Sequence, residues 1–77
     1  MFQNRNLSVL AYANGFTLWH YKNNEDSLET IEKPGFFDKV KTLMYVGDII
    51  TINAKDGTTI RAVTETSPSV IIGPLTK

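Results

Sequence analysis

The stretch LSVLAYANGFTLWHYK, residues 7–22, decides which fold this chain can adopt. It consists of two apolar runs joined by Asn14 and Gly15. An Asn-Gly pair between two such runs is the strongest short-range signal for a β-hairpin, because a type I′ turn needs positive φ at both central residues. Glycine adopts that conformation freely, and asparagine does so more readily than most residues. The sequence therefore predicts a hairpin with a type I′ turn. Its first run, 7–13, is predicted as a strand, with a short helix as the alternative.

The second run of the hairpin carries apolar groups on both of its faces. Alternate residues of a strand share a face, which groups Phe16 with Leu18 and His20, and Thr17 with Trp19 and Tyr21. A strand that is covered on one side only should alternate between apolar and polar residues. We therefore expect cover on both sides, with Phe16 and Leu18 filling the core and Trp19 and Tyr21 facing a neighbouring subunit.

The length and the cysteine count limit how this chain can be stabilised. With 77 residues, a single core supplies only about 3–5 kcal/mol of net stability. The absence of cysteine excludes disulfides and thiolate zinc sites, and a single histidine excludes an imidazole-rich metal site within one chain. Oligomerisation is the remaining common means of stabilising a small domain, so the sequence predicts a homo-oligomer.

The charge pattern argues against two classes of partner. Eight basic residues balance eight acidic ones, and the basic residues are scattered along the chain. A nucleic-acid-binding domain normally has a basic excess or a basic stripe, so the composition argues against nucleic acid. The longest apolar run is far shorter than the ~20 residues of a membrane-spanning helix, so no membrane partner is expected.

The segment after Pro34 has a helical period. Phe36, Val40 and Leu43 are spaced i, i+4 and i+7, which is typical of an amphipathic helix. A helix of about two turns is too short to be stable alone. The spacing therefore predicts a short helix around 36–44 that caps one open end of a sheet.

The rest of the chain is predicted to form strands. A second hairpin with a type I′ turn is expected at Asp56 and Gly57, between strands 49–54 and 58–65. Weaker apolar patterns predict short strands at 28–33 and 70–72. Together these elements predict a single domain over 1–77 that is mainly β, either a small β-barrel or a β-rich α+β fold, with two hairpins and one capping helix.

Few side chains offer catalytic or metal-binding chemistry. His20 is the only side chain that titrates near neutral pH unperturbed, and no spacing typical of a Ser-His-Asp or Cys-His arrangement surrounds it. We expect His20 to be a sheet residue with a satisfied ring nitrogen. The acidic residues at 25, 26, 29 and 32 lack the spacing of a calcium loop. The sequence thus predicts no enzyme, no cofactor and no metal site.

The aromatic side chains of the hairpin form the candidate interaction site. We assign Trp19, Tyr21, His20 and Tyr12 to a subunit interface, where Trp and Tyr are enriched. Stacking on a glycan is the alternative, and base stacking in a nucleic-acid site has less support without a basic groove. The predicted function is a non-enzymatic, self-assembling structural or interaction module, with a glycan-binding domain as the second hypothesis.

The combination YANGFTLWHY, PGFFDKV and VGDIITINAKDG resembles a family of short proteins from bacteriophages and marine alphaproteobacteria. In that family an NGF-x-LW-x-Y segment precedes a GYF-like turn and a GD-x-I-x-V strand. The resemblance covers residues 12–57, and Phe36-Phe37 stands where the pattern has Tyr-Phe. It brings no catalytic residues. It implies a viral origin and a virion-associated role, in which small β-rich proteins often form trimeric fibre or decoration modules.

Overall fold

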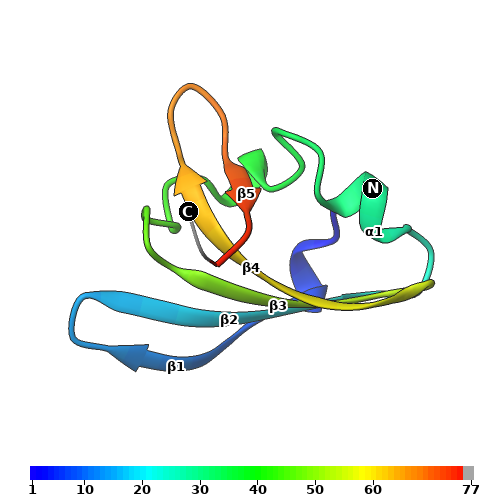
Figure 1. Ribbon diagram of the computed structural model, residues 1–77, viewed down its shortest axis with the longest axis horizontal. Helices are drawn as coiled ribbons and strands as arrows, with labels where there is room; N and C mark the ends of the chain where they lie inside the picture. The colour runs from blue at the N-terminus through cyan, green and yellow to red at the C-terminus, as the bar shows by residue number, and fades with distance from the viewer. Residues whose placement is uncertain (76–77) are drawn as a thin grey trace.

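The computed structural model describes residues 1–75 and contains one five-stranded sheet (Figure 1). The strands are β1 (Leu7–Ala13), β2 (Phe16–Asn23), β3 (Ile49–Ala54), β4 (Gly57–Glu65) and β5 (Ile71–Gly73). They lie side by side in the order β1-β2-β3-β4-β5, so β1 and β5 are the two edges of an open sheet. The predicted β-rich α+β fold is confirmed, and the sheet does not close into a barrel.

The first hairpin forms as predicted, and residues 7–13 are a strand. Ala13 pairs with Phe16, which leaves Asn14 and Gly15 as a two-residue loop. Gly15 has a φ of 102°, but no non-glycine residue among 1–75 has a positive φ. The type I′ prediction is therefore wrong, because Asn14 keeps an ordinary φ; positive φ at only the second central residue is typical of a type II turn.

The second hairpin also forms, but its turn lies one residue earlier than predicted. Ala54 pairs with Gly57, so the loop consists of Lys55 and Asp56, and Gly57 already belongs to β4. Neither loop residue has a positive φ, which again excludes type I′. The prediction from the Asp-Gly pair located the hairpin correctly but assigned the wrong two residues to its loop.

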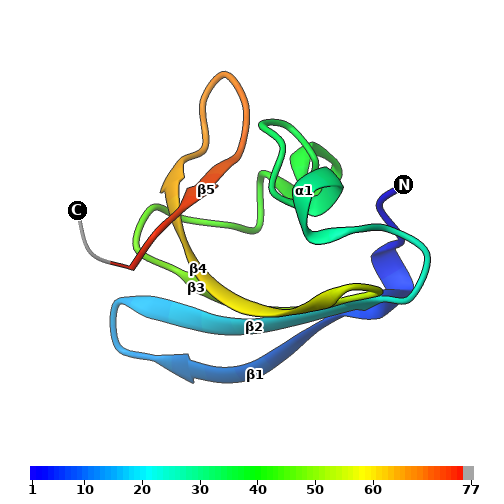
Figure 2. The same cartoon turned by 45° about the vertical axis from the view of Figure 1, so that its right-hand side comes forward.

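The strands β2 and β3 are parallel, a pairing that the sequence did not predict. Their register runs from Leu18 with Ile49 to Asn23 with Ala54. Parallel neighbours need a long crossover connection, and here residues 24–48 supply it. Figures 1 and 2 show this crossover on one side of the sheet, together with the N-terminal segment, which includes a 3-10 helix at Asn4–Asn6.

The crossover contains two short helical pieces. The α-helix α1 (Leu28–Ile31) replaces the strand predicted at 28–33, because Ser27 caps it by accepting a hydrogen bond from the Thr30 amide at 3.2 Å. The helix predicted around 36–44 is only a 3-10 helix at Asp38–Val40. This segment caps the sheet as expected, but Leu43 points outward and is exposed.

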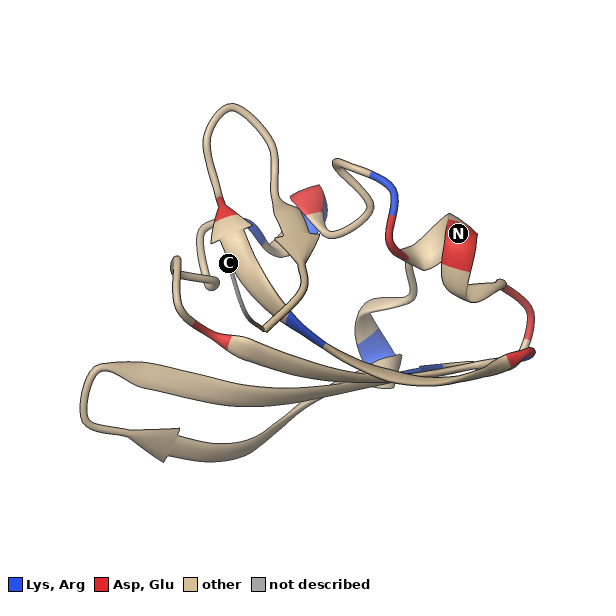
Figure 3. Cartoon of the chain, viewed as in Figure 1, with Lys and Arg blue, Asp and Glu red and all other residues tan. Residues whose placement is uncertain are grey.

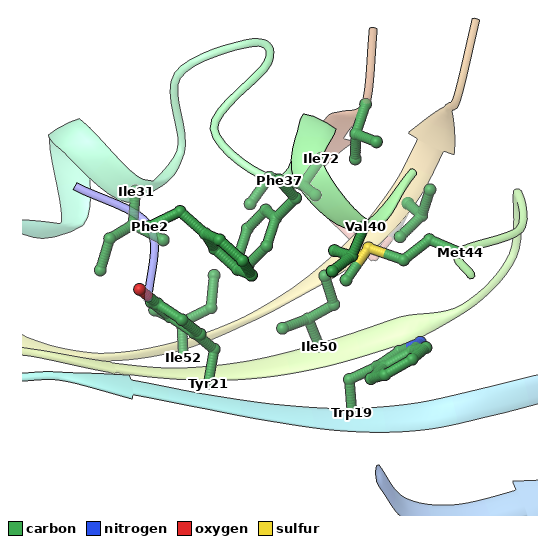
Figure 4. Packing of buried hydrophobic residues seen from close by; sticks show 12 residues of the cluster. Phe2, Trp19, Tyr21, Ile31, Phe37, Val40, Met44, Ile50, Ile52 and Ile72 are labelled. Carbon is green, nitrogen blue, oxygen red and sulfur yellow. The ribbon is translucent and has the colours of Figure 1, made fainter. Parts of the chain in front are cut away.

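The core lies between the sheet and the crossover. Its centre is aromatic: Phe2 stacks on Tyr21 at 5.4 Å between ring centroids, and Phe36 and Phe37 meet both rings edge to face. Figure 4 shows Tyr21 and Trp19 rising from β2 toward the segments that cover them. Among the described residues, no helix has the length and apolar character needed to cross a membrane.

Candidate functional site

The structure inverts the two faces that the sequence assigned to β2. Trp19 is 6% exposed and Tyr21 is fully buried, so these rings form the core instead of facing a neighbour. Phe16, expected in the core, is 37% exposed and lies on the opposite face with Leu18. The physical reason is that the crossover and the N-terminal segment supply partners for the polar ends of Trp19 and Tyr21. Large amphipathic rings are readily buried once those polar ends are satisfied.

The partner of Trp19 is a buried carboxylate that the sequence analysis missed. Asp48 is fully buried and accepts hydrogen bonds from the Trp19 Nε1 at 3.0 Å, the Thr17 amide at 3.0 Å and the Tyr45 amide at 3.1 Å. It directly precedes β3, so its bond to Thr17 extends the contact between β2 and β3 beyond the parallel ladder. Its position between Gly47 and a run of isoleucines gave no signal for this role.

The partners of Tyr21 are equally structural. The Tyr21 hydroxyl accepts from the Gln3 amide at 2.9 Å and from the Asn23 Nδ2 at 3.1 Å. The Asn23 Oδ1 in turn accepts from the amides of Glu25 at 2.8 Å and Asp26 at 3.2 Å. No buried side-chain nitrogen or oxygen among residues 1–75 lacks a partner. The buried polar groups therefore fix the fold and leave no group free for chemistry in the core.

His20 lies on the face of the sheet away from the core, and its ring nitrogen is satisfied as predicted. The His20 Nε2 is 2.7 Å from the Asn53 Nδ2, and the Asn53 Oδ1 accepts from the Thr58 hydroxyl at 2.6 Å. With the amide nitrogen donating, the ring accepts at Nε2 and carries its proton at Nδ1. Within the described part of the chain, no three His, Cys, Asp or Glu side chains come together as a metal site.

The face that carries His20 has no cover from any described segment. Figure 2 shows the crossover and both ends of the described chain on the other side of the sheet or beside it. We define the open face by the residues that the strand registers place on it: Ser8, Ala11, Ala13, Phe16, Leu18, His20, Lys22, Ile49, Thr51, Asn53, Thr58, Ile60, Ala62, Glu65, Ile71 and Gly73. Most of them are apolar or small, and the two charged ones, Lys22 and Glu65, lie at opposite ends of the face.

The hairpin of β1 and β2 carries no charge between Arg5 and Lys22. Figure 3 shows this as an uninterrupted tan ribbon, while acidic and basic residues colour the rest of the molecule. The same hairpin exposes four large apolar side chains, Val9, Leu10, Tyr12 and Phe16. Edge strands of soluble proteins usually carry charged residues or proline that discourage association. The edge strand β1 has neither.

Tyr12 is the one predicted site aromatic that is widely exposed, at 81%. It borders a shallow hollow of about 240 Å³ that is lined by Tyr12, Gly15, Phe16, Thr17, Tyr45 and Asp48. A second, more polar hollow of about 270 Å³ lies near the N-terminal segment and is lined by Gln3, Arg5, Asn6, Asn23, Asn24 and Glu25. The structure thus separates the four predicted site residues: Trp19 and Tyr21 are in the core, His20 is on the open face and Tyr12 is beside the first hollow.

Comparison of the chain with protein-family models, with curated proteins and with solved structures finds no match.

Proposed function

We propose that this protein is a non-enzymatic interaction module that self-associates through its charge-free hairpin. The observation that carries the proposal is the stretch from Asn6 to Tyr21, which has no charged residue and exposes four large apolar side chains. Large exposed apolar side chains gathered on one uncharged element often mark an interaction site. The chain has no net charge, so its copies do not repel one another strongly.

The polar groups near the hairpin support a structural role over a catalytic one. Asp48 is engaged by three donors, and His20 is bonded to Asn53. General acid–base catalysis needs a group within reach of a substrate proton, usually in a pocket. Asp48 borders the first hollow, but it is fully buried and its carboxylate is already engaged by three donors, and His20 lies on a sheet face away from both hollows.

Self-association is tested by sedimentation velocity over a wide range of protein concentration. We expect the average mass to rise with concentration, and Phe16→Lys to lower it toward that of a monomer. Leu43→Lys is the control, because Leu43 is also an exposed apolar residue, at 57% against 37% for Phe16, and lies outside the hairpin. A mass that stays monomeric at every concentration would contradict the proposal.

The resemblance to short phage and alphaproteobacterial proteins favours a virion as the setting of the proposed module, as a fibre or decoration component. This setting is tested by the genes that flank the coding sequence. Capsid, portal or tail genes alongside it would support a virion-associated role. A neighbourhood of metabolic genes would contradict that setting and leave the self-association to be judged by the sedimentation experiment.

Glycan binding is the second candidate function, and the hollow beside Tyr12 favours it. Tyr12 and Tyr45 are both exposed and both border this hollow, so their rings can offer apolar faces to a sugar. The originally assigned Trp19 and Tyr21 are buried and cannot take part without unfolding. A glycan array with the wild type and Tyr12→Ala is the test: a signal lost in the variant supports binding, and no signal with the wild type contradicts it.

A further inference from the structure

We infer that the open face of the sheet packs against the same face of a second copy, which gives a two-layer β-sandwich dimer. This inference rests on the proposed self-association and names the surface that performs it. It starts from one level of the sheet, where the registers place Ala11, Leu18, Ile49, Ala62 and Gly73 directly beside one another across all five strands. This row contains no polar side chain, and four of the five are partly buried by their neighbours alone.

The surroundings of the apolar row suit a second layer. On one side of it lies Phe16, 37% exposed, and on the other lies Ile60, 46% exposed. The next level consists of uncharged side chains, including His20 and Thr51. The hydrogen bond between His20 Nε2 and Asn53 is made within one chain and can persist when a second sheet covers this face, so only the other ring nitrogen needs a partner from the second copy. When two sheets pack face to face, large side chains of one sheet fit beside small side chains of the other.

Pairing of two β1 edges is the main alternative, and the structure disfavours it. The register of β1 slips between Val9 and Ala11, so a β-bulge at Leu10 interrupts the edge. Bulges bend a strand and are one of the devices that protect sheet edges from pairing. The other edge, β5, is only three residues long. Neither edge offers a long regular ladder, whereas the open face extends over all five strands.

A second copy fits this face better than an unlike partner. Unlike partners are normally selected and oriented by complementary charge, and this face carries only one charge of each sign, Lys22 and Glu65, at its opposite ends. A neutral apolar face is complementary to itself. The first hollow touches this face only at Phe16 and the second does not touch it, so neither forms a pocket for a small ligand within it.

The size of the open face matches a reversible dimer. Five strands at ~4.8 Å spacing and about 20 Å of strand length give roughly 500 Å² in plan. This plan is smaller than the ~800 Å² per partner of a standard interface, which is the range of weak, reversible association. A dimer therefore needs nearly the whole face, and a single charged substitution within it should weaken the dimer measurably.

The test compares three glutamate variants by sedimentation equilibrium. Ile60→Glu lies on the open face in β4, opposite Thr51 of β3, and Ala11→Glu lies on the same face in β1. Val9→Glu is the matched control, since Val9 is adjacent to the bulge and 55% exposed but pairs with Trp19 on the opposite face. We expect Ile60→Glu and Ala11→Glu to raise the dimer dissociation constant by roughly tenfold or more, and Val9→Glu to change it little.

The outcomes separate the inference from the proposed function. A dimer that survives Ile60→Glu but dissociates with Val9→Glu would overturn the face-to-face arrangement and keep self-association, as would a trimeric mass. A monomeric wild type would overturn both. If a variant fails to fold by circular dichroism, methyl NMR of the wild type on dilution decides: shifts at Leu18, Ile49 and Ile60 support the inference, and shifts confined to Val9 and Leu43 contradict it.

Discussion

At the scale of single residues, Asp48 connects the parts of the molecule that sequence patterns treat separately. Its carboxylate receives Thr17 and Trp19 from β2 and Tyr45 from the crossover. Its own carbonyl accepts from the Val63 amide of β4 at 2.8 Å. A buried carboxylate without a cationic partner is tolerable only when donors surround it. Asp48 therefore depends on the fold that it helps to hold.

We predict that Asp48→Asn lowers the free energy of unfolding by about 1–3 kcal/mol. An asparagine keeps one acceptor oxygen and turns an NH₂ group toward a site that contains only donors, so a buried donor loses its partner. Urea denaturation followed by Trp19 fluorescence measures the change. The matched control is Asp56→Asn, whose exposed carboxylate accepts one bond from the Leu28 amide, at 2.9 Å. Equal losses in the two variants would contradict the role assigned to Asp48.

The orientation of β2 shows what residue-level patterns can and cannot predict. The alternation between the two faces was predictable from the strand, but which face is buried was not, because both faces contain large apolar groups. The choice depends on partners that are distant in sequence: Asp48 for Trp19, and Gln3 for Tyr21. His20 was placed correctly as a satisfied sheet residue, since an isolated histidine without catalytic neighbours has that role most often.

At the scale of elements, the hairpins were predictable because their signals are local. Asn14-Gly15 and Asp56-Gly57 each stand at a real chain reversal. The parallel pair of β2 and β3 was not predictable, because its strands are separated by the whole crossover. The helical period at 36–44 predicted the wrong element for a related reason. Phe37, Val40 and Met44 are buried by tertiary contacts, and a 3-10 helix with turns buries these side chains as well as an α-helix would.

We predict that Gly15→Ala destabilises the first hairpin by about 1–2 kcal/mol, the cost of a left-handed backbone for an L-residue. Gly15 has a φ of 102°, and a methyl group there would meet no atom within 4 Å, so the effect is conformational and not steric. Gly73→Ala is the control, because its φ lies outside that region and its added carbon would only touch Thr64, at 3.4 Å. Thermal unfolding at low protein concentration measures both, and equal stability of the two variants would contradict the prediction.

At the scale of the whole molecule, the sheet has one face that folding covers and one that it leaves open. The sequence already contained this asymmetry, since β2 has too many apolar groups for a strand that is covered on one side. One apolar face of β2 still lacks cover although the two faces are inverted. Phe16 and Leu18, in place of Trp19 and Tyr21, are the residues on the uncovered face. A domain of this size gains stability from association because its own core is small.

We therefore predict that the melting temperature of the wild type rises with protein concentration, by about 3–5 °C per tenfold increase above the dissociation constant. Association stabilises the folded state by mass action, whereas a monomer melts at a temperature that does not depend on its concentration. Differential scanning calorimetry over a concentration series measures the slope. Ile60→Glu should flatten it, because the variant places a carboxylate on the open face without touching the core.

The response to salt shows whether apolar or charged interactions cause the melting temperature to depend on protein concentration. Because the open face carries only Lys22 and Glu65, at its opposite ends, sodium chloride has few interfacial charges to screen and should leave the concentration dependence nearly unchanged. Sodium sulfate strengthens apolar burial by its exclusion from protein surfaces, so it should shift the dimer to lower concentration. A slope that sodium chloride abolishes would show that charged groups elsewhere hold the copies together, and would count against the open face as the interface.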